Sequence, residues 1–285
     1  MNIKLYLGAH KTATTHIQKL LDANREKLIT NNIKLSIPDD IRAKWLPALY
    51  EYSNLHNIKY LSAIKSECPE NGTWIVAEEN ISGTSYEFKI HSGIYPNLKN
   101  RLNSIKSIFK DDNIELFFSI RSYDSFYRSA YLEVVRNRGY TPFTDFYDEK
   151  RYKNNSWVNV LDALISIIPE ENITLWCYED FREIIPDLLR GLTGLDSVSE
   201  FISAYTVETT RPSLSKKTIE ILASLYPVIS QAESLQLVER INSVYASNDY
   251  FMPFSKEEIE IFQIKYKVDV SKIRSEYPNI KFLSA

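Results

Sequence analysis

Four short apolar runs constrain the fold of this chain more than any other feature of its sequence. They occupy residues 3–7, 73–77, 114–120 and 173–177, and segments with helical spacing of apolar residues separate them. Strands that alternate with helices form a parallel sheet, because right-handed crossovers place the helices on its two faces. We therefore predict an α/β fold with three layers, in which helices flank a central parallel sheet.

The remaining segments have predominantly helical patterns. From residue 14 the apolar positions follow a helical spacing, and similar patterns cover 98–110 and 155–168. Residues 40–66 indicate one or two helices broken near Pro47. We expect one domain over residues 1–285 with a helical C-terminal region from about residue 181, and a separate helical subdomain is the alternative. In that region the helical patterns cover 181–190, 197–204, 215–229, 231–247 and 255–275.

Charge and cysteine usage exclude several classes of protein. With 34 Lys and Arg against 37 Asp and Glu, the net charge is -3, which argues against the broad basic field of a nucleic-acid binder. No run approaches the roughly 18–20 apolar residues of a membrane span, and the N-terminal apolar run is too short for a signal peptide. Two cysteines cannot build a disulfide framework. We expect a cytoplasmic protein without nucleic-acid or membrane partners, and the sequence leaves its oligomeric state open.

The segment that joins the first strand to the first helix has the composition of an anion site. It reads Gly8-Ala9-His10-Lys11-Thr12-Ala13-Thr14-Thr15. Such a loop presents backbone N–H groups and the positive end of a helix dipole, to which Lys11 adds a charge and the threonines add hydroxyl groups. Gly8 stands out because only 7 of the 285 residues are glycine, well under the roughly 7% average.

A second anchor follows the strand at 114–120. Arg121 lies at the carboxyl end of that strand, the edge where open α/β sheets bind ligands. Ser129 comes eight residues later, about two helical turns along a helix that starts near Asp124. Arginine offers a forked and permanently charged contact to phosphate, so this pair indicates a second anion contact.

Together these segments resemble the bacterial sulfotransferases that use 3′-phosphoadenylyl sulfate (PAPS). This is a P-loop-like family, and the resemblance is to its carbohydrate-type members. The loop, with the following His16-Ile17-Gln18 and Asn24-Arg25, is similar to their 5′-phosphosulfate loop, although Ala13 stands where glycine is common. Arg121 and Ser129 match their 3′-phosphate motif. The resemblance implies PAPS as sulfuryl donor, adenosine 3′,5′-bisphosphate (PAP) as product, and donor contacts from Gly8, Lys11, Thr12, Ala13, Thr14, Thr15, Arg121 and Ser129.

Two further segments are similar to parts of that family. Residues 210–215 resemble a late loop that closes over the nucleotide, which would bring Arg211 to the 3′-phosphate. The segment Tyr178-Glu179-Asp180-Phe181 resembles the family's Y-E-D-[LF] sequence, and we assign its carboxylates to structure because they charge the first turn of a helix. No metal is expected, because the four histidines show no paired spacing with carboxylates or cysteines.

Catalysis of sulfuryl transfer requires charge stabilisation and a base. Lys11 is the candidate to neutralise the departing phosphate. Bacterial members often end their second strand in S-S-E, and Glu79 falls on that glutamate, so we predict Glu79 as the base. Glu78, His10 and His16 are the alternatives, and His10 is also a candidate to contact the sulfate or the acceptor.

The acceptor is less constrained than the donor. The resemblance implies a hydroxyl or amine group of an acceptor, with a bacterial surface carbohydrate as the natural choice, and Arg128, Arg136 and Arg138 are candidates to guide an acidic glycan. Two other functions stay open. A P-loop-type small-molecule kinase is disfavoured by the missing GxxxxGK sequence and by the lack of a strand that ends in a clear magnesium-holding Asp. A non-catalytic nucleotide- or glycan-binding relative is indicated only by Ala13.

Overall fold

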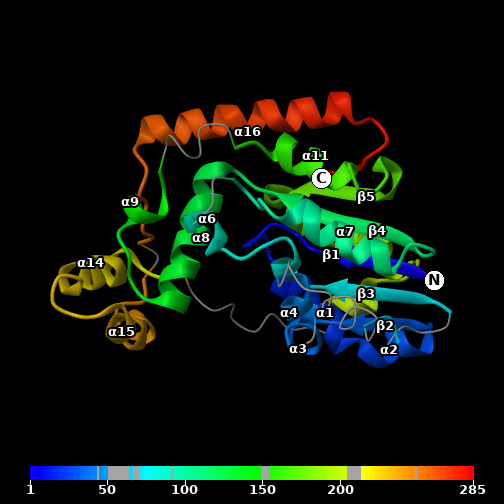
Figure 1. Cartoon of the computed structure of the whole chain (residues 1–285), viewed down its shortest axis with the longest axis horizontal. Coiled ribbons are helices and arrows are strands. Elements are labelled where there is room, and N and C mark those ends of the chain that lie inside the picture. The colour runs from blue at the N-terminus through cyan, green and yellow to red at the C-terminus, as the bar shows by residue number, and fades with distance from the viewer. Residues whose placement is uncertain are drawn as a thin grey trace.

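A parallel sheet with strand order β2-β3-β1-β4-β5-β6 lies between two layers of helices (Figure 1). The structure is a computed structural model that describes residues 1–43, 45–50, 64–66, 71–90, 93–148, 155–203, 213–247 and 249–285. The predicted α/β class and the parallel central sheet are thereby confirmed. The strands are β1 (Asn2–Tyr6), β2 (Ile33–Ser36), β3 (Thr73–Ala77), β4 (Asn113–Ile120), β5 (Ile173–Cys177) and β6 (Lys281–Leu283).

The apolar strands are continuous because both faces of the sheet are covered. Successive side chains point to opposite faces, so Leu5 packs into one hydrophobic cluster and Tyr6 into the other. One face is covered by α1 (Thr14–Ala23), α2 (Arg25–Thr30), α12 (Phe181–Thr193) and α13 (Ser199–Ser203). The other carries α7 (Leu98–Ile108), α8 (Tyr123–Arg138), α11 (Trp157–Ile165) and α16 (Lys256–Glu276).

The other helices complete the described chain. Between β2 and β3 lie α3 (Pro38–Ile41) and α4 (Trp45–Tyr50). Helix α3 ends at Ile41 and α4 begins at Trp45, so a break lies close to Pro47, which itself sits in the first turn of α4, where the missing N–H group of proline is not used. Residues 51–63 of the predicted segment lie outside the described residues. The remaining elements are η1 (Glu79–Ile81), α6 (Glu87–Ile90), α9 (Phe143–Phe146), η2 (Glu170–Asn172), η3 (Tyr178–Asp180), α14 (Lys216–Leu225) and α15 (Gln231–Val244).

Two adjacent strands send the chain to opposite faces of the sheet. The chain leaves β1 into α1, which belongs to one hydrophobic cluster, and leaves β4 into α8, which belongs to the other. Because β1 and β4 are hydrogen-bonded neighbours, their carboxyl ends border a topological switch point. Open α/β sheets bind ligands in the crevice at such a point. The fold therefore places the loop after β1 beside the segment after β4.

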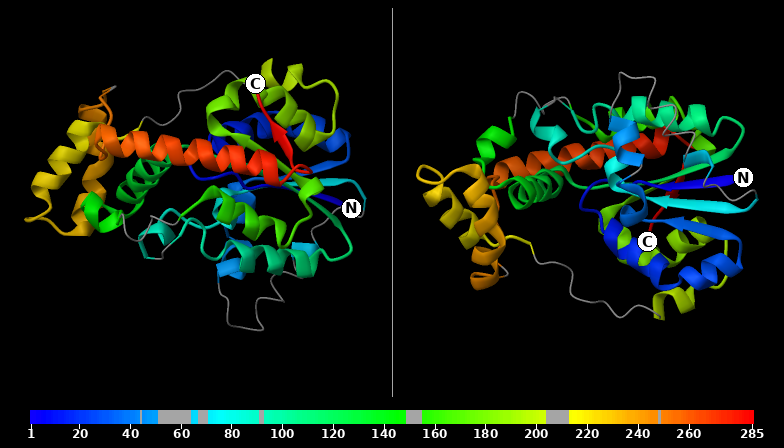
Figure 2. Two further views of the ribbon diagram at one scale, coloured as in Figure 1. Left: turned by 90° about the horizontal axis from the view of Figure 1, so that it is seen from above. Right: turned by 60° about the horizontal axis from the view of Figure 1, so that its bottom comes forward.

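The C-terminal third is helical, as predicted, and ends in a strand that the sequence did not indicate. Helices α14 and α15 lie at the far end of the molecule from the sheet, and α16 runs back alongside α8 (Figures 1 and 2). The buried carboxylate of Asp269 on α16 accepts hydrogen bonds from the Tyr123 hydroxyl on α8 and from the Trp157 N–H group on α11. Strand β6 then pairs in parallel with β5. Among the described residues, no helix has the length and apolar character to span a membrane.

Candidate functional site

Gly8 starts the loop after β1 in a conformation that suits glycine. Its φ is +55°, and a Cβ atom at this position would lie 2.6 Å from the Thr14 Cγ2 atom. The loop is held against β4 by two backbone hydrogen bonds, from Gly8 N–H to Phe117 C=O (3.3 Å) and from Ala9 N–H to Ser119 C=O (3.2 Å). The loop therefore turns tightly at the carboxyl edge of the sheet.

Beyond His10 several backbone N–H groups of the loop have no hydrogen-bond partner among the described residues. Within the described part of the chain, the N–H groups of residues 11–15 have no acceptor, and the first intrahelical donor of α1 is His16, which bonds to Ala13 C=O (2.9 Å). A run of unpaired N–H groups at a helix N-terminus, together with the helix dipole, binds anions. This geometry agrees with the predicted anion site.

Ala13 occupies the N-cap of α1 in the left-handed conformation, with φ +60° and ψ +25°. That conformation costs an L-residue roughly 1–2 kcal/mol, whereas glycine adopts it freely. The structure thus gives a physical reason for glycine at this position in the similar loops.

The three threonines of the loop differ in what they present. The Thr12 hydroxyl donates to Ala9 C=O (2.5 Å) and accepts from the Ser119 hydroxyl (2.6 Å), and the side chain is fully buried. The Thr12 hydroxyl is therefore engaged inside the protein. Thr14 is buried beneath the loop, whereas Thr15 is exposed at the start of α1. The predicted donor contacts of these residues stay predictions.

The structure brings the two sequence-predicted anchors into direct contact. The Arg121 guanidinium donates through Nη1 to the Lys11 carbonyl oxygen and through Nε to the Ser125 hydroxyl (2.8 Å). It also lies over the ring of Tyr178, 4.3 Å from the centroid. Burial lowers the pKa of Arg121. The side chain therefore links the loop after β1, the start of α8 and the segment after β5.

One face of α8 continues from Arg121 toward the loop. Ser125 contacts Arg121, and Glu133 forms an ion pair with Lys11, with 3.2 Å between Glu133 Oε2 and Lys11 Nζ. Ser129 lies between them at the same four-residue spacing, so it shares this face. The predicted partner of Arg121 is thus on the side of α8 that adjoins the loop.

The three arginines of α8 have different surroundings. Arg128 lies close enough to Arg121 for its charge to contribute to the lowered pKa of that guanidinium, after burial. Arg136 donates to Glu239 on α15 (2.8 Å), and Arg138 lies 5.0 Å from the ring centroid of Tyr86. Arg136 is therefore engaged between helices, and its proposed role toward a glycan stays a prediction.

A pocket of about 380 Å³ adjoins Arg121. From the sequence, the carboxylates of the segment at its far wall, Glu179 and Asp180, are assigned to structure, and no pocket is predicted there. The signal was available, because β5 neighbours β4 and its carboxyl end opens on the same edge of the sheet. The pocket is lined by Arg121, Ser125, Tyr178, Glu179, Phe181 and Arg182.

Glu179 has a structural part in this wall. Its carboxylate accepts hydrogen bonds from the Ser122 N–H group (3.1 Å) and from the Tyr266 hydroxyl (2.8 Å). It therefore caps the first turn of α8 and connects it to α16. This agrees with the assignment of this carboxylate to structure.

Two adjacent carboxylates after β3 have different environments. Glu78 is fully buried, accepts from the Arg42 Nε atom (2.8 Å), and has a pKa that burial raises. Glu79 keeps 15% of its side-chain surface exposed and accepts from Gln18 Nε2 (3.1 Å) on α1. Of the two carboxylates, Glu79 is the one that solvent and an acceptor can reach.

Neither His10 in the loop nor His16 in α1 has the surroundings of a free base. His10 is buried, with Nδ1 2.9 Å from the Tyr95 hydroxyl and Nε2 3.1 Å from Asn80 Oδ1. The Nε2–H tautomer satisfies every contact, because Nε2 then donates to Asn80 Oδ1, Nδ1 accepts from the Tyr95 hydroxyl, and the Tyr95 oxygen accepts from the backbone N–H group of His10 (2.7 Å). Burial lowers the pKa of His10, and His16 packs edge-on against Phe181. The geometry makes His10 a support of the loop.

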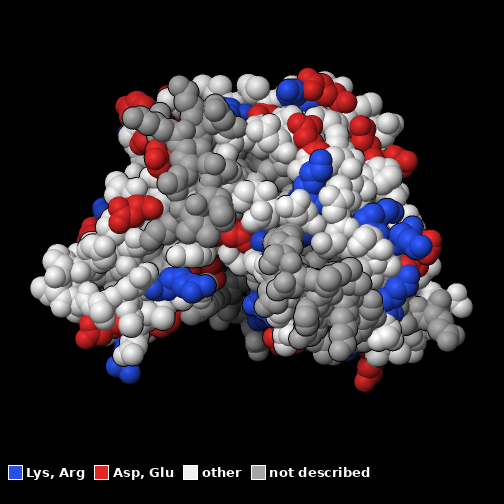
Figure 3. Space-filling model, in the orientation of Figure 1, with Lys and Arg blue, Asp and Glu red and all other residues white. Residues whose placement is uncertain are grey.

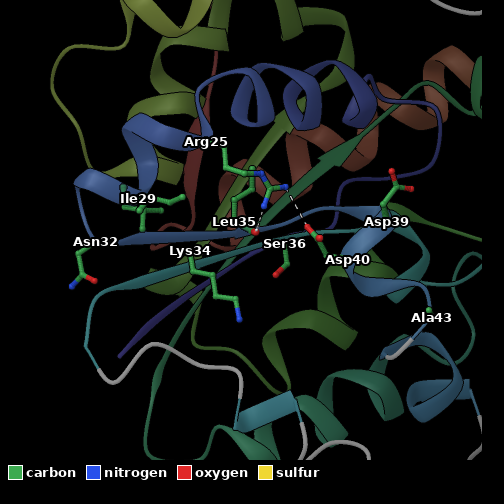
Figure 4. Close-up of a pocket in the computed structure, with 10 residues that line it drawn as sticks. Arg25, Ile29, Asn32, Lys34, Leu35, Ser36, Asp39, Asp40 and Ala43 are labelled. Atoms are coloured by element: carbon green, nitrogen blue, oxygen red, sulfur yellow. Dashed lines mark hydrogen bonds and ion pairs between the residues drawn. The ribbon is translucent and has the colours of Figure 1, made fainter.

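The remaining predicted positions lie elsewhere. Arg211 falls outside the described residues. Among the described residues, no group of three or more His, Cys, Asp or Glu side chains has a metal-binding arrangement. A larger pocket, of about 540 Å³, lies along the edge strand β2 (Figure 4). There the Arg25 guanidinium is engaged by Asp40 (3.3 Å) and by Leu35 C=O (3.2 Å), so it is not part of the anion site.

Comparison with known proteins gives only weak similarity. No protein-family model matches this chain, and no curated protein matches it. Similar solved structures include retinol dehydratase with androsterone and the inactive cofactor PAP, at 14% identity over 98% of this chain and 83% of that one, with a TM-score of 0.38. Another is retinol dehydratase with retinol and PAP, at 11% identity over 94% and 81%, with a TM-score of 0.37. Similarity of this extent does not place the chain in a family.

Proposed function

We propose that this protein is a sulfotransferase that moves the sulfuryl group of PAPS to a hydroxyl or amine group of an acceptor. The observation that carries the proposal is the contact between Arg121 and the carbonyl oxygen of Lys11. It joins the unpaired N–H groups of the loop to a half-buried guanidinium and its pocket. Two adjoining anion sites suit a donor that carries a 5′-phosphosulfate and a 3′-phosphate.

The charges of the site support this choice over a site for a single small anion. The loop offers N–H groups and Lys11, while Arg121 and Arg182 border the 380 Å³ pocket between the segments after β4 and β5. The aromatic rings of Tyr178 and Phe181 form part of the same wall. A nucleotide needs both a cationic contact for phosphate and an aromatic or apolar surface for its base, and this region supplies both.

In the proposed reaction the acceptor oxygen attacks sulfur in line with the phosphate leaving group. A new S–O bond forms to the acceptor, the S–O bond to the bridging phosphate oxygen breaks, and PAP departs with the electron pair. Lys11 and the loop N–H groups stabilise the charge that develops on the departing phosphate. Glu79 takes the proton of the acceptor hydroxyl, and the structure leaves its carboxylate partly exposed for this role.

For the acceptor we propose a bacterial surface carbohydrate. The support is the similarity of the loop and of the segment after β4 to the carbohydrate-type bacterial enzymes. Transfer of ³⁵S from labelled PAPS to a panel of polysaccharides, oligosaccharides, small phenols and steroids, followed by product mapping, tests this choice. Label that reaches only small phenols or steroids would reject the carbohydrate acceptor and keep the sulfotransferase.

Calorimetric titration with PAP and with ATP tests the donor. We expect micromolar or tighter binding of PAP and at least tenfold weaker binding of ATP, because PAP carries a separate phosphate for each of the two proposed anion sites, whereas ATP has no 3′-phosphate. Tight ATP binding without PAP binding would overturn the proposal in favour of a kinase. PAP binding without any sulfuryl transfer would instead favour a non-catalytic relative.

Lys11→Ala provides the matching test of chemistry. We expect transfer to fall by 10² or more, with the unfolding midpoint in urea nearly unchanged, because the Lys11 side chain is 40% exposed. Lys19→Ala is the control, since Lys19 is an exposed lysine of α1. Full activity in Lys11→Ala would remove this side chain from the mechanism.

A further inference from the structure

The ammonium group of Lys11 is engaged by a carboxylate from another element. Its Nζ atom lies 3.2 Å from Glu133 Oε2, across 122 positions of sequence. Glu133 is on the face of α8 that also carries Ser125 and Ser129, and its side chain is 27% exposed. The pair is only partly shielded from water, so its strength lies between that of an open surface pair and that of a buried one.

Glu133 is itself held in place for this contact. Its second carboxylate oxygen, Oε1, accepts a hydrogen bond from Asn137 Nδ2 (2.8 Å), one helical turn further along α8. Burial opposes the charge of Glu133, but the positive charge of Lys11 and the hydrogen bond from Asn137 lower its pKa overall. The carboxylate is therefore ionised at neutral pH, with one partner for each oxygen.

The backbone of Lys11 is held from the same side of the molecule. The residue has a left-handed φ of +63°, and its carbonyl oxygen accepts from Arg121, at the start of α8. Main chain and side chain of Lys11 are thus both fixed by the segment that follows β4. No residue pattern near Lys11 or Glu133 in sequence indicates this pairing.

We propose that Glu133 is the positioning residue of Lys11: it holds the ammonium group beside the anion cradle in the free protein and yields it when the donor's anion binds. This inference rests on the proposed function. The donor then competes with an internal carboxylate for the same cation, so Glu133 lowers the affinity for the nucleotide and eases release of PAP.

A competing partner has a signature that a structural support lacks. Replacing Glu133 by glutamine keeps the size of the side chain and the contact with Asn137 but removes the charge that attracts Lys11. We expect Glu133→Gln to bind PAP about threefold to tenfold more tightly than the wild type, the range that corresponds to a partly shielded ion pair. A residue that only supported the loop would weaken PAP binding when it is replaced.

The experiment measures the dissociation constant of PAP by calorimetry for the wild type, Glu133→Gln, Lys11→Ala and the double variant. We expect the gain in Glu133→Gln to disappear when Lys11 is already absent. Glu239→Gln is the control for charge. It removes one negative charge from α15, where Glu239 pairs with Arg136, which is at another position on α8. We expect it to change the affinity by less than twofold.

A ligand-free measurement accompanies the titration. Acetylation by acetic anhydride, followed by mass spectrometry, gives the reactivity of Lys11 relative to Lys19, and we expect the ratio to rise at least threefold in Glu133→Gln. Failure of the wild type to bind PAP overturns the proposed function. With PAP binding intact, an unchanged or weaker affinity in Glu133→Gln, an unchanged acetylation ratio, or a gain that persists without Lys11 overturns the role of Glu133 alone.

Discussion

The left-handed turn at Ala13 predicts an unusual effect of a substitution to glycine. Ala13→Gly removes a conformational strain of roughly 1–2 kcal/mol and adds a backbone entropy cost of about 0.5–1 kcal/mol. The free energy of unfolding should therefore rise by about 0.5–1 kcal/mol, and PAP affinity should be preserved, because the loop N–H groups do not move. Urea unfolding and calorimetry measure the two quantities.

Ala9→Gly is the matched control for this prediction. Ala9 lies in the same loop, is fully buried and has no positive φ, so glycine there should lower the free energy of unfolding by about 1 kcal/mol. Equal effects of the two substitutions would contradict the argument from conformation. A large gain in PAP affinity in Ala13→Gly would show instead that alanine distorts the loop.

His10 makes stability depend on pH in a definite direction. Burial lowers its pKa in the folded state below the value of about 6.5 in the unfolded chain. Below pH 6.5 the unfolded chain binds a proton that the folded protein does not, so stability present above that pH is lost as the pH falls. Urea unfolding at pH 7 and pH 5 should show a larger loss in the wild type than in His10→Gln.

The size of this difference is limited by the proton linkage of one group, at most about 1.4 kcal/mol for each pH unit. Titration of the His10 ring resonances by NMR gives the folded pKa directly. A ring that titrates at or above its ordinary pKa, or equal pH dependence in both proteins, would contradict the buried neutral imidazole.

At the scale of residues, a feature can be predicted from the sequence when it depends on local contacts, and not when it depends on distant ones. The predicted anion contacts of Gly8, Lys11 and Arg121 rest on backbone turns and on the ends of strands, which are readable from local pattern. The pairing of Lys11 with Glu133 depends on where α8 lies in space. For the same reason the sequence could not show that the Thr12 hydroxyl is used inside the protein.

At the scale of elements, long apolar strands were predictable and short ones were not. β1, β3, β4 and β5 coincide with the four predicted runs because each is buried on both faces. β2 spans only four residues and β6 three, so neither is long enough for a pattern that separates it from a loop. Their place at the two edges of the sheet explains why so little apolar sequence suffices.

The start of α8 gives a prediction for Arg121. Arg121→Ala removes the guanidinium that joins the loop to the pocket, and we expect PAP binding to weaken by about tenfold to a hundredfold, the range for a lost charged hydrogen bond. Arg190→Ala is the matched control, because this arginine of α12 is half-exposed and pairs with Asp187 on the same helix. Unchanged affinity in Arg121→Ala would remove the residue from the donor site.

At the scale of the whole molecule, the site is a small cationic centre in a mildly acidic protein. Acidic and basic side chains are interspersed on the face seen in Figure 3, in keeping with a net charge of -3. The proposed anion site draws on backbone N–H groups and on two nearby cations, Lys11 and Arg121, so it does not require a broad basic field. Long-range steering of the donor should accordingly be weak.

The chain returns through α16 to β6 at the edge of the sheet. This path predicts that stability and PAP binding depend on different parts of the molecule. Ile280 and Leu283 are buried, so ending the chain at Glu276 should lower the free energy of unfolding by about 3–5 kcal/mol. β6 lies two strands beyond β4, away from the switch point beside β1. We therefore expect the PAP affinity of the shortened protein to stay within about threefold of the wild type.

Two further variants keep this prediction decisive. Removal of the exposed Ser284 and Ala285 alone should change neither quantity. Leu283→Ala, which keeps the chain length, should cost about 2–3 kcal/mol and leave PAP binding intact, and it replaces the truncation if that protein does not fold. Loss of PAP affinity in folded Leu283→Ala would mean that the sheet edge and the donor site are coupled. That result would move the site away from the β1–β4 switch point.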